Sequence, residues 1–274
     1  MNIRYTLLAL GLTVGLVQGV PEEISVEQQI KVNATDLDDV LTMSDSFWTY
    51  LSQSRQALGW KTFTKGIAYV FTSPQALKDI YAAATKNLRY RNGVKVIGAA
   101  AYVEFLAKED MPFLSPEQKQ KLIDIAWQVK PNVPLIEFYQ FCQKELHIPI
   151  YVWTDNDEAG YTRKMANLNA ELIKLGKPEF IPDGVKWAEA STPKKAGLSK
   201  DHAQYFKEGY QVIQEKHPEF LETQKVLFID DKKKNVDNAR KAAATENLKL
   251  DAFQYTGKKD GDLNALKAKF ILAK

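Results

Sequence analysis

The sequence predicts an α/β fold, a parallel sheet with helices on both faces and a mostly helical segment inserted after the first strand. Short apolar strands alternate with amphipathic helices from Ile148 onward, which is typical of parallel doubly wound sheets. Between Leu41 and Leu146, by contrast, helical periodicity continues without clear strands. A crossover between parallel strands needs only about a dozen residues. We therefore interpret this longer segment as a helical insertion that covers the ligand-binding edge of the sheet.

The first strand runs from Gln29 to Thr35 and leads into an acidic turn with Asp36 and Asp38. Residues two apart in a strand share one face, so both carboxylates project to one side if the extended geometry continues beyond Thr35. In the insertion we expect helices at 43–58, 94–106, 115–127 and 134–146, another beginning at Ser73-Pro74, and an apolar run at 67–72 that is a strand or part of the insertion. Beyond it we expect strands at 148–154, 185–190, 225–231 and 248–255, and helices at 159–175, 198–215, 235–244 and 262–272.

These elements predict three regions. Residues 1–19 have the pattern of a secretory signal peptide, because Arg4 gives a positive start and the apolar run Tyr5–Val17 is short for a membrane span; the alternative is an uncleaved anchor. We therefore expect an exported protein, periplasmic or secreted, without stable membrane insertion after signal cleavage. Residues 20–41 and 147–274 would form the α/β core, and residues 42–146 the helical cap.

The composition is that of an ordinary globular protein, with 45% hydrophobic and 26% charged residues. The net charge of +3 is too small to indicate binding to nucleic acid. Cys142 is the only cysteine of the chain, so no disulfide can form within it.

Polar side chains end three of the predicted strands. Asp36 and Asp38 follow the first, Thr154 ends the second, and Asp230 and Asp231 end the fourth. Since the C-terminal ends of parallel strands lie along one edge of a sheet, these groups can converge. Neighbouring carboxylates repel each other, and a divalent cation between them would relieve the repulsion. For each group alone, a solvated turn or a helix cap is the ordinary alternative.

This order of motifs resembles the haloacid dehalogenase superfamily of phosphohydrolases, within it a poorly characterised bacterial branch of exported proteins. Asp36 and Asp38 match the first motif of the superfamily, two acids one residue apart after an apolar strand. Thr154 matches the second motif, and Asp230 with Asp231 matches the fourth. The helical segment between the first two motifs stands where the family inserts its cap.

The resemblance implies Mg²⁺-dependent hydrolysis of a small phosphomonoester. Asp36 would attack phosphorus and form an aspartyl-phosphate, while Asp38 would protonate the leaving oxygen and then activate a water molecule. Mg²⁺ would be held by the Asp36 carboxylate, the Asp38 backbone carbonyl and Asp230, with Asp231 acting directly or through water. Thr154 would donate a hydrogen bond to a phosphoryl oxygen.

The third motif of the superfamily is a lysine that offsets the charge of the phosphate. Lys194, Lys195 and Lys200 all follow the third predicted strand, and we favour Lys200 because it lies beside the start of the next helix. For each of them an exposed surface lysine is the ordinary alternative. Asp39 stands where many members of the superfamily carry glycine, a departure that the superfamily tolerates.

A second interpretation is a secreted binding protein or effector that keeps the fold but has little or no catalytic activity. The ambiguous third motif and the large insertion motivate it. A lysine ammonium within hydrogen-bond reach of Asp36 would favour the enzyme, and three solvent-exposed candidate lysines would favour the binding protein. Phosphoryl transfer to an acceptor other than water is a third reading.

Overall fold

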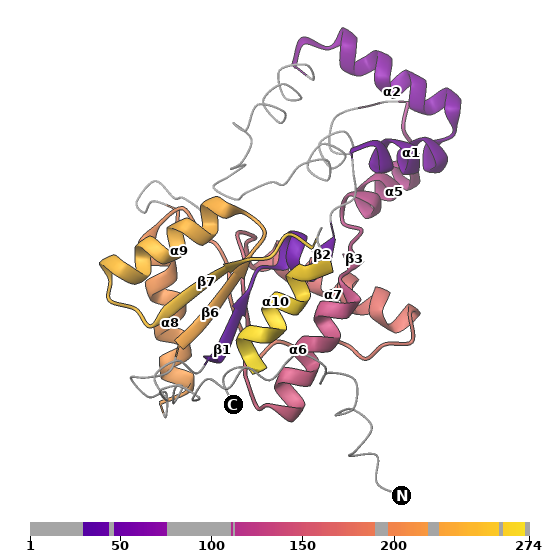
Figure 1. Cartoon of the computed structure of the whole chain (residues 1–274). Helices are drawn as coiled ribbons and strands as arrows, with labels where there is room; N and C mark the ends of the chain where they lie inside the picture. The colour runs from indigo at the N-terminus through magenta and orange to yellow at the C-terminus, as the bar shows by residue number, and fades with distance from the viewer. Residues whose placement is uncertain are drawn as a thin grey trace, which may run out of the picture.

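A five-stranded, wholly parallel sheet forms the centre of the protein, in the strand order β5-β4-β1-β6-β7 (Figure 1). The computed structural model describes residues 30–43, 47–75, 111, 113–189, 197–218, 225–257 and 260–271. The strands are β1 (Ile30–Thr35), β4 (Ile150–Trp153), β5 (Gly184–Lys186), β6 (Lys225–Asp230) and β7 (Leu250–Gln254). The first strand in sequence is thus the middle strand of the sheet, with β4 and β6 as its neighbours.

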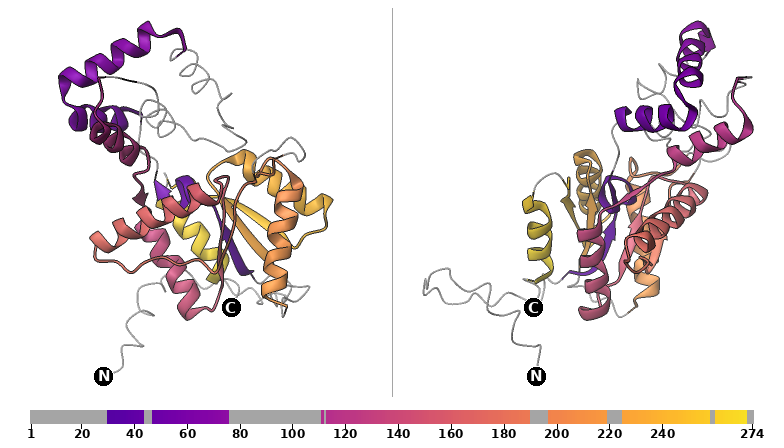
Figure 2. Two further views of the ribbon diagram at one scale, coloured as in Figure 1. Left: turned by 180° about the vertical axis from the view of Figure 1, so that it is seen from behind. Right: turned by 90° about the vertical axis from the view of Figure 1, so that its right-hand side faces the viewer.

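Helices cover both faces of this sheet (Figures 1 and 2). One face carries α6 (Val133–Glu145), α7 (Glu158–Lys174) and α10 (Asp260–Ile271), and the other carries α8 (Ala203–Lys216) and α9 (Lys233–Thr245). Each layer has its own cluster of buried apolar side chains. The predicted fold class, a parallel sheet between helical layers, is therefore confirmed.

The buried strands supply side chains alternately to the two clusters, as strand geometry requires. In β4, Ile150 and Val152 pack in the cluster under α6 and α7, whereas Tyr151 and Trp153 pack in the cluster under α8 and α9. All four residues are buried, which explains why β4 is continuously apolar rather than alternating.

The inserted segment has a small apolar cluster of its own. It contains α1 (Phe47–Leu58), α2 (Trp60–Thr72) and α5 (Pro116–Ala126), and it lies beyond the C-terminal ends of the strands (Figure 1). The run at 67–72 belongs to α2, so it is part of the insertion and not a strand. Two short strands that the sequence did not predict, β2 (Thr42–Met43) and β3 (Lys130–Pro131), pair antiparallel where the segment leaves and rejoins the sheet. The expected helix at 94–106, and most of the one starting at Ser73-Pro74, lie outside the described residues.

Helix α6 packs with the sheet, although residues 42–146 were all assigned to the cap. Leu135, Tyr139 and Cys142 of α6 are buried in the same cluster as Ile150 and Val152 of β4. The periodicity of this helix showed that it had an apolar face but not which partner covers that face. The other domain boundaries stay predictions.

Residues 1–19 lie outside the described residues, so the export signal stays a prediction as well. Among the helices that the structure describes, none is both long enough and apolar enough to cross a bilayer.

Candidate active site

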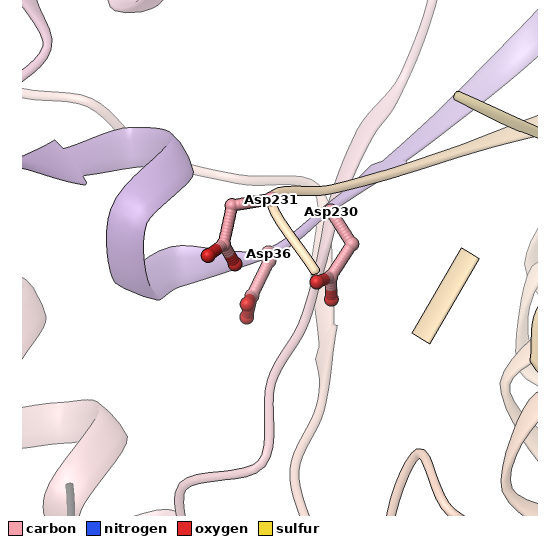
Figure 3. Close-up of side chains that lie close together, drawn as sticks. All are labelled: Asp36, Asp230 and Asp231. Atoms are coloured by element: carbon pink, nitrogen blue, oxygen red, sulfur yellow. The ribbon is translucent and has the colours of Figure 1, made fainter. Parts of the chain in front are cut away.

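Three carboxylates meet at the C-terminal edge of the sheet. Asp36 follows β1, Asp230 is the last residue of β6, and Asp231 comes directly after it. Each offers one oxygen, and these oxygens lie within 4.8 Å of one another (Figure 3). Because β1 and β6 are hydrogen-bonded neighbours with Thr35 opposite Ile229, their ends bring the acids together across the ladder.

The ammonium group of Lys200 bridges two of these acids. Its Nζ atom lies 2.7 Å from Oδ1 of Asp36 and 2.7 Å from Oδ2 of Asp230. The Lys200 side chain is fully buried, and its backbone N–H donates to Oδ1 of Asp155 at 3.0 Å. Lys194 and Lys195, the alternative candidates for this position, lie outside the described residues.

The single positive charge of Lys200 does not balance the charges of Asp36, Asp230 and Asp231. Burial raises the pKa of Asp36 well above its ordinary value; the Lys200 charge opposes the rise, and the Asp230 charge adds to it. Burial lowers the pKa of Lys200, but Asp230 and Asp36 outweigh that effect, so its pKa lies well above the ordinary value and the ammonium stays charged. When Asp36, Asp230 and Asp231 are all ionised, their charge exceeds that of Lys200 and the nearby Lys232, and a further cation would balance the difference.

Among the three acids, Asp231 is the one with a buried carboxylate oxygen that lacks a hydrogen-bond donor in the described part of the chain. Its Oδ1 atom is buried and receives no hydrogen bond from the described residues, and Lys232 Nζ lies 3.9 Å away. Burial raises the pKa of Asp231 to about 6, although the Lys232 charge opposes this. Three convergent carboxylates, one with a buried oxygen that lacks a donor, are the hard oxygen ligands that Mg²⁺ prefers. The residues present therefore fit such an ion.

Asp230 is held in one orientation by residues that follow it, Lys232 and Asn235 at the start of α9. The side-chain amide of Asn235 donates to both carboxylate oxygens at 3.0 Å, and the backbone N–H of Lys232 donates to Oδ1 at 2.9 Å. These contacts place Asp230 beside Asp36 before any cation binds.

The carboxylate of Asp38 does not join the three-acid group, contrary to the expectation that Asp36 and Asp38 would face one cation. The chain leaves the strand after Thr35 and turns through η3 (Leu37–Leu41), in which Asp39 has the left-handed angles φ 61° and ψ 1°. The oxygens that lie within 4.8 Å of one another come from Asp36, Asp230 and Asp231 and do not include the Asp38 carboxylate. The backbone carbonyl of Asp38, the atom that the family resemblance implies as a metal ligand, stays a prediction.

Asp38 instead contacts two residues that the sequence analysis missed. Lys164 Nζ lies 2.6 Å from its Oδ1 atom, and Asn156 Nδ2 donates to its Oδ2 atom at 3.0 Å. Burial alone would raise the pKa of Asp38, but the Lys164 charge and hydrogen bonds from Lys164 and Asn156 outweigh burial and lower the pKa below its ordinary value. The position of Asn156, two residues after Thr154, could have identified it as a site residue. The position of Lys164 within its helix gave no such indication.

Thr154 is fully buried beside this network. Its Oγ1 atom accepts hydrogen bonds from the backbone N–H of Asn156 at 3.1 Å and from the Asn156 amide at 2.7 Å. With both lone pairs engaged, the hydroxyl hydrogen is oriented to donate to another acceptor. Tyr205 supports the strand end, since its hydroxyl lies 2.9 Å from the Thr154 carbonyl and 2.8 Å from that of Lys186.

No protein-family profile and no curated protein matches the chain. Among solved structures, it is similar to an L-2-haloacid dehalogenase that is 13% identical, with a TM-score of 0.43 and coverage of 85% of this chain and 90% of the other. The L-2-haloacid dehalogenase of Xanthobacter autotrophicus is 17% identical, with a TM-score of 0.40 and coverage of 90% and 84%. A phosphoserine phosphatase, in a phospho-aspartyl intermediate analogue, is 14% identical, with a TM-score of 0.38 and coverage of 87% and 98%.

These similarities have identities of 13–17% and TM-scores of 0.38–0.43, and they assign the chain to no family. The candidate site is defined by the convergence of Asp36, Asp230 and Asp231 in the structure itself.

Proposed function

We propose that this protein is a Mg²⁺-dependent phosphohydrolase that acts on a small phosphomonoester through an aspartyl-phosphate. The observation that carries the proposal is the three-acid group of Asp36, Asp230 and Asp231 with the buried ammonium of Lys200 between two of its members. When bound, Mg²⁺ would be held by Asp36, Asp230 and Asp231 together with the Asp38 carbonyl, and would offset the charge of the phosphate.

In the first half-reaction, a carboxylate oxygen of Asp36 forms a bond to phosphorus while the bond from phosphorus to the leaving oxygen breaks. The leaving oxygen keeps the electron pair and takes a proton from protonated Asp38. Lys200 and the Thr154 hydroxyl donate to phosphoryl oxygens. A carboxylate is a weak nucleophile and depends on such neutralisation and alignment of the phosphate.

In the second half-reaction, a water molecule attacks the phosphorus of the aspartyl-phosphate. Asp38, now a carboxylate, accepts a proton from this water, and the bond between phosphorus and Asp36 breaks. Inorganic phosphate leaves and Asp36 is regenerated. Asp38 lies only two residues from Asp36, yet it has different partners. Its lowered pKa favours the carboxylate, which is the form that accepts the proton in this second half-reaction. The first half-reaction requires that the negative charge of the bound phosphate raise that pKa.

The direct test is release of phosphate from para-nitrophenyl phosphate by the purified protein, with Mg²⁺ and with EDTA. We expect activity that requires Mg²⁺ and is abolished in Asp36→Asn. Asp237→Asn is the matched control, because Asp237 is a half-exposed partner of Lys233 on α9 and lies outside the three-acid group. Equal activity of wild type and Asp36→Asn would disprove the proposal.

The alternative is a binding protein or effector of the same fold with little or no catalysis. The position of Lys200 argues against it, since this lysine is buried against Asp36 rather than exposed to solvent. Protein that binds Mg²⁺ but releases phosphate from no member of a panel of phosphorylated metabolites would favour this alternative. Phosphate appearing on an added alcohol instead of in solution would indicate a transferase.

Export is also part of the proposal, supported by the charged start and the short apolar run of residues 1–19. N-terminal sequencing of protein recovered from the periplasm or the medium is expected to begin near residue 20. Recovery of uncleaved chain from the cytoplasm would contradict it.

A further inference from the structure

The two oxygens of the Asp38 carboxylate have separate donors on the segment that follows β4. Lys164, on α7, contacts Oδ1 at 2.6 Å, and Asn156, between β4 and α7, donates to Oδ2 at 3.0 Å. The side chains of Lys164 and Asp38 are only 12% and 11% exposed. A carboxylate bonded at both oxygens cannot rotate freely, so its orientation is set by these two residues.

The same network fixes Asp38 relative to Thr154. The Asn156 amide lies 3.0 Å from Asp38 Oδ2 and 2.7 Å from Thr154 Oγ1. Asp157 caps the start of α7 by accepting from the N–H of Gly160 at 2.8 Å, so the helix that carries Lys164 is anchored beside the same strand end. Asp38, which would protonate the leaving oxygen, and Thr154, which would donate to a phosphoryl oxygen, are thereby held together through Asn156.

We propose that Lys164 is a positioning residue that, together with Asn156, orients Asp38 for proton transfer to the leaving oxygen. This inference rests on the proposed phosphohydrolase function. It goes beyond the family motifs, which contain neither Lys164 nor Asn156. The cost of losing Lys164 then depends on how much the leaving group needs a proton. Esters of alcohols need one, whereas esters of acidic phenols leave readily without it.

The experiment compares kcat and KM on para-nitrophenyl phosphate, phenyl phosphate and glycerol phosphate for wild type and Lys164→Met. On glycerol phosphate we expect kcat to fall by about tenfold to a hundredfold, with KM nearly unchanged. This loss is smaller than the full contribution of a positioned acid, about 10²–10⁴-fold, because Asp38 itself is retained. On para-nitrophenyl phosphate the loss should be within about threefold, because this leaving group depends little on the acid. Lys164→Arg, which keeps a cationic donor, should recover part of the rate on glycerol phosphate.

Lys186→Met is the matched control for the loss of a partly buried ion pair. The Lys186 side chain is also 12% exposed and pairs with Glu208 at 2.8 Å and Glu189 at 3.3 Å. We expect it to leave the ratio of the glycerol and nitrophenyl rates unchanged. Asp38→Asn should show a leaving-group dependence at least as steep as that of Lys164→Met.

The outcomes separate this inference from the proposed function. A wild-type protein that releases phosphate, combined with a Lys164→Met variant slowed equally on all three esters, would overturn the positioning role and leave the phosphohydrolase intact. A faster Lys164→Met variant on glycerol phosphate would overturn it as well. A wild-type protein inactive on every ester would overturn both.

Discussion

Lys200 Nζ lies 2.7 Å from the carboxylate of Asp36 and at the same distance from Asp230, so one buried ammonium group joins the ends of the two central strands. The Lys200 and Asp230 side chains are completely buried, and that of Asp36 is 5% exposed. Buried charges are tolerated only when they are paired. The integrity of this edge of the sheet therefore depends on Lys200, or on a cation that replaces its charge.

We expect Lys200→Met to destabilise the metal-free protein. Removing one partner of a buried ion pair leaves uncompensated charge and costs about 3–5 kcal/mol. Mg²⁺ should restore more stability to this variant than to wild type, because a cation binding only the folded state stabilises it by mass action and no lysine then competes for the acids. Thermal unfolding with EDTA and with increasing Mg²⁺ measures both effects.

Lys174→Met is a suitable control, because Lys174 is 69% exposed and pairs with Glu171 on the surface of α7. It should change stability little, with or without Mg²⁺. A Lys200→Met protein as stable as wild type in EDTA would contradict the structural role that we assign to this lysine.

Gly209 on α8 lets the helix approach the Trp153 ring at the end of β4. A Cβ atom at this position would lie 2.8 Å from two atoms of the indole. We expect Gly209→Ala to destabilise the protein by about 1–3 kcal/mol, the usual cost of overpacking a core. Urea unfolding measures it.

Gly66→Ala on α2 gives the opposite expectation, since the nearest atom to its added Cβ is 4.0 Å away. There the alanine should be neutral or stabilising by up to about 1 kcal/mol, as its helix propensity exceeds that of glycine. Equal effects of the two substitutions would show that the Trp153 contact does not constrain α8.

Asp39 is in the left-handed region at φ 61°, a backbone conformation that glycine adopts without steric cost. We expect Asp39→Gly to be close to neutral, because relief of backbone strain is offset by the entropy that glycine loses on folding. Asp39→Val should lose about 1–2 kcal/mol, since a β-branched residue is strained at this φ. Denaturant unfolding compares the two variants, and a Val variant as stable as the Gly variant would mean that η3 readjusts without strain.

The predictable parts of the site were those that end an apolar run. Asp36, Thr154 and Asp230 each stand at the C-terminal end of a buried strand, and parallel strands bring such ends to one edge. Lys164 was not predictable, because its contact with Asp38 depends on how α7 lies against η3 and leaves no periodic signal.

The same distinction applies to the fold. The helix starting after Ser115 was predictable because a capping box and Pro116 signal it locally. Gly176, at φ 68°, likewise follows the C-cap of α7 and is a local signal for the end of that helix. Strands β2 and β3 have two residues each, too few to show alternation. The assignment of α6 to the cap failed because an apolar helix face does not say which neighbour covers it.

The thiol of Cys142, the only cysteine, should be unreactive in the native protein. It is fully buried in α6, and burial raises its pKa to about 12. Only the thiolate reacts readily, so both access and ionisation oppose modification. A disulfide reagent at neutral pH should label the folded protein slowly and the protein in guanidinium fully, with Cys142→Ala as the blank.

The same pKa shift contributes to the pH dependence of stability. The thiol of the unfolded chain ionises near its ordinary value of 9.0, and that of the folded chain at about 12. This contribution is therefore fully present below pH 9.0 and is lost as the pH rises towards 12. Wild type should lose more unfolding free energy than Cys142→Ala over that alkaline interval, while below it the difference between the two proteins stays constant. Rapid labelling of the native thiol at neutral pH, or parallel alkaline profiles for the two proteins, would contradict the buried, protonated state of this cysteine.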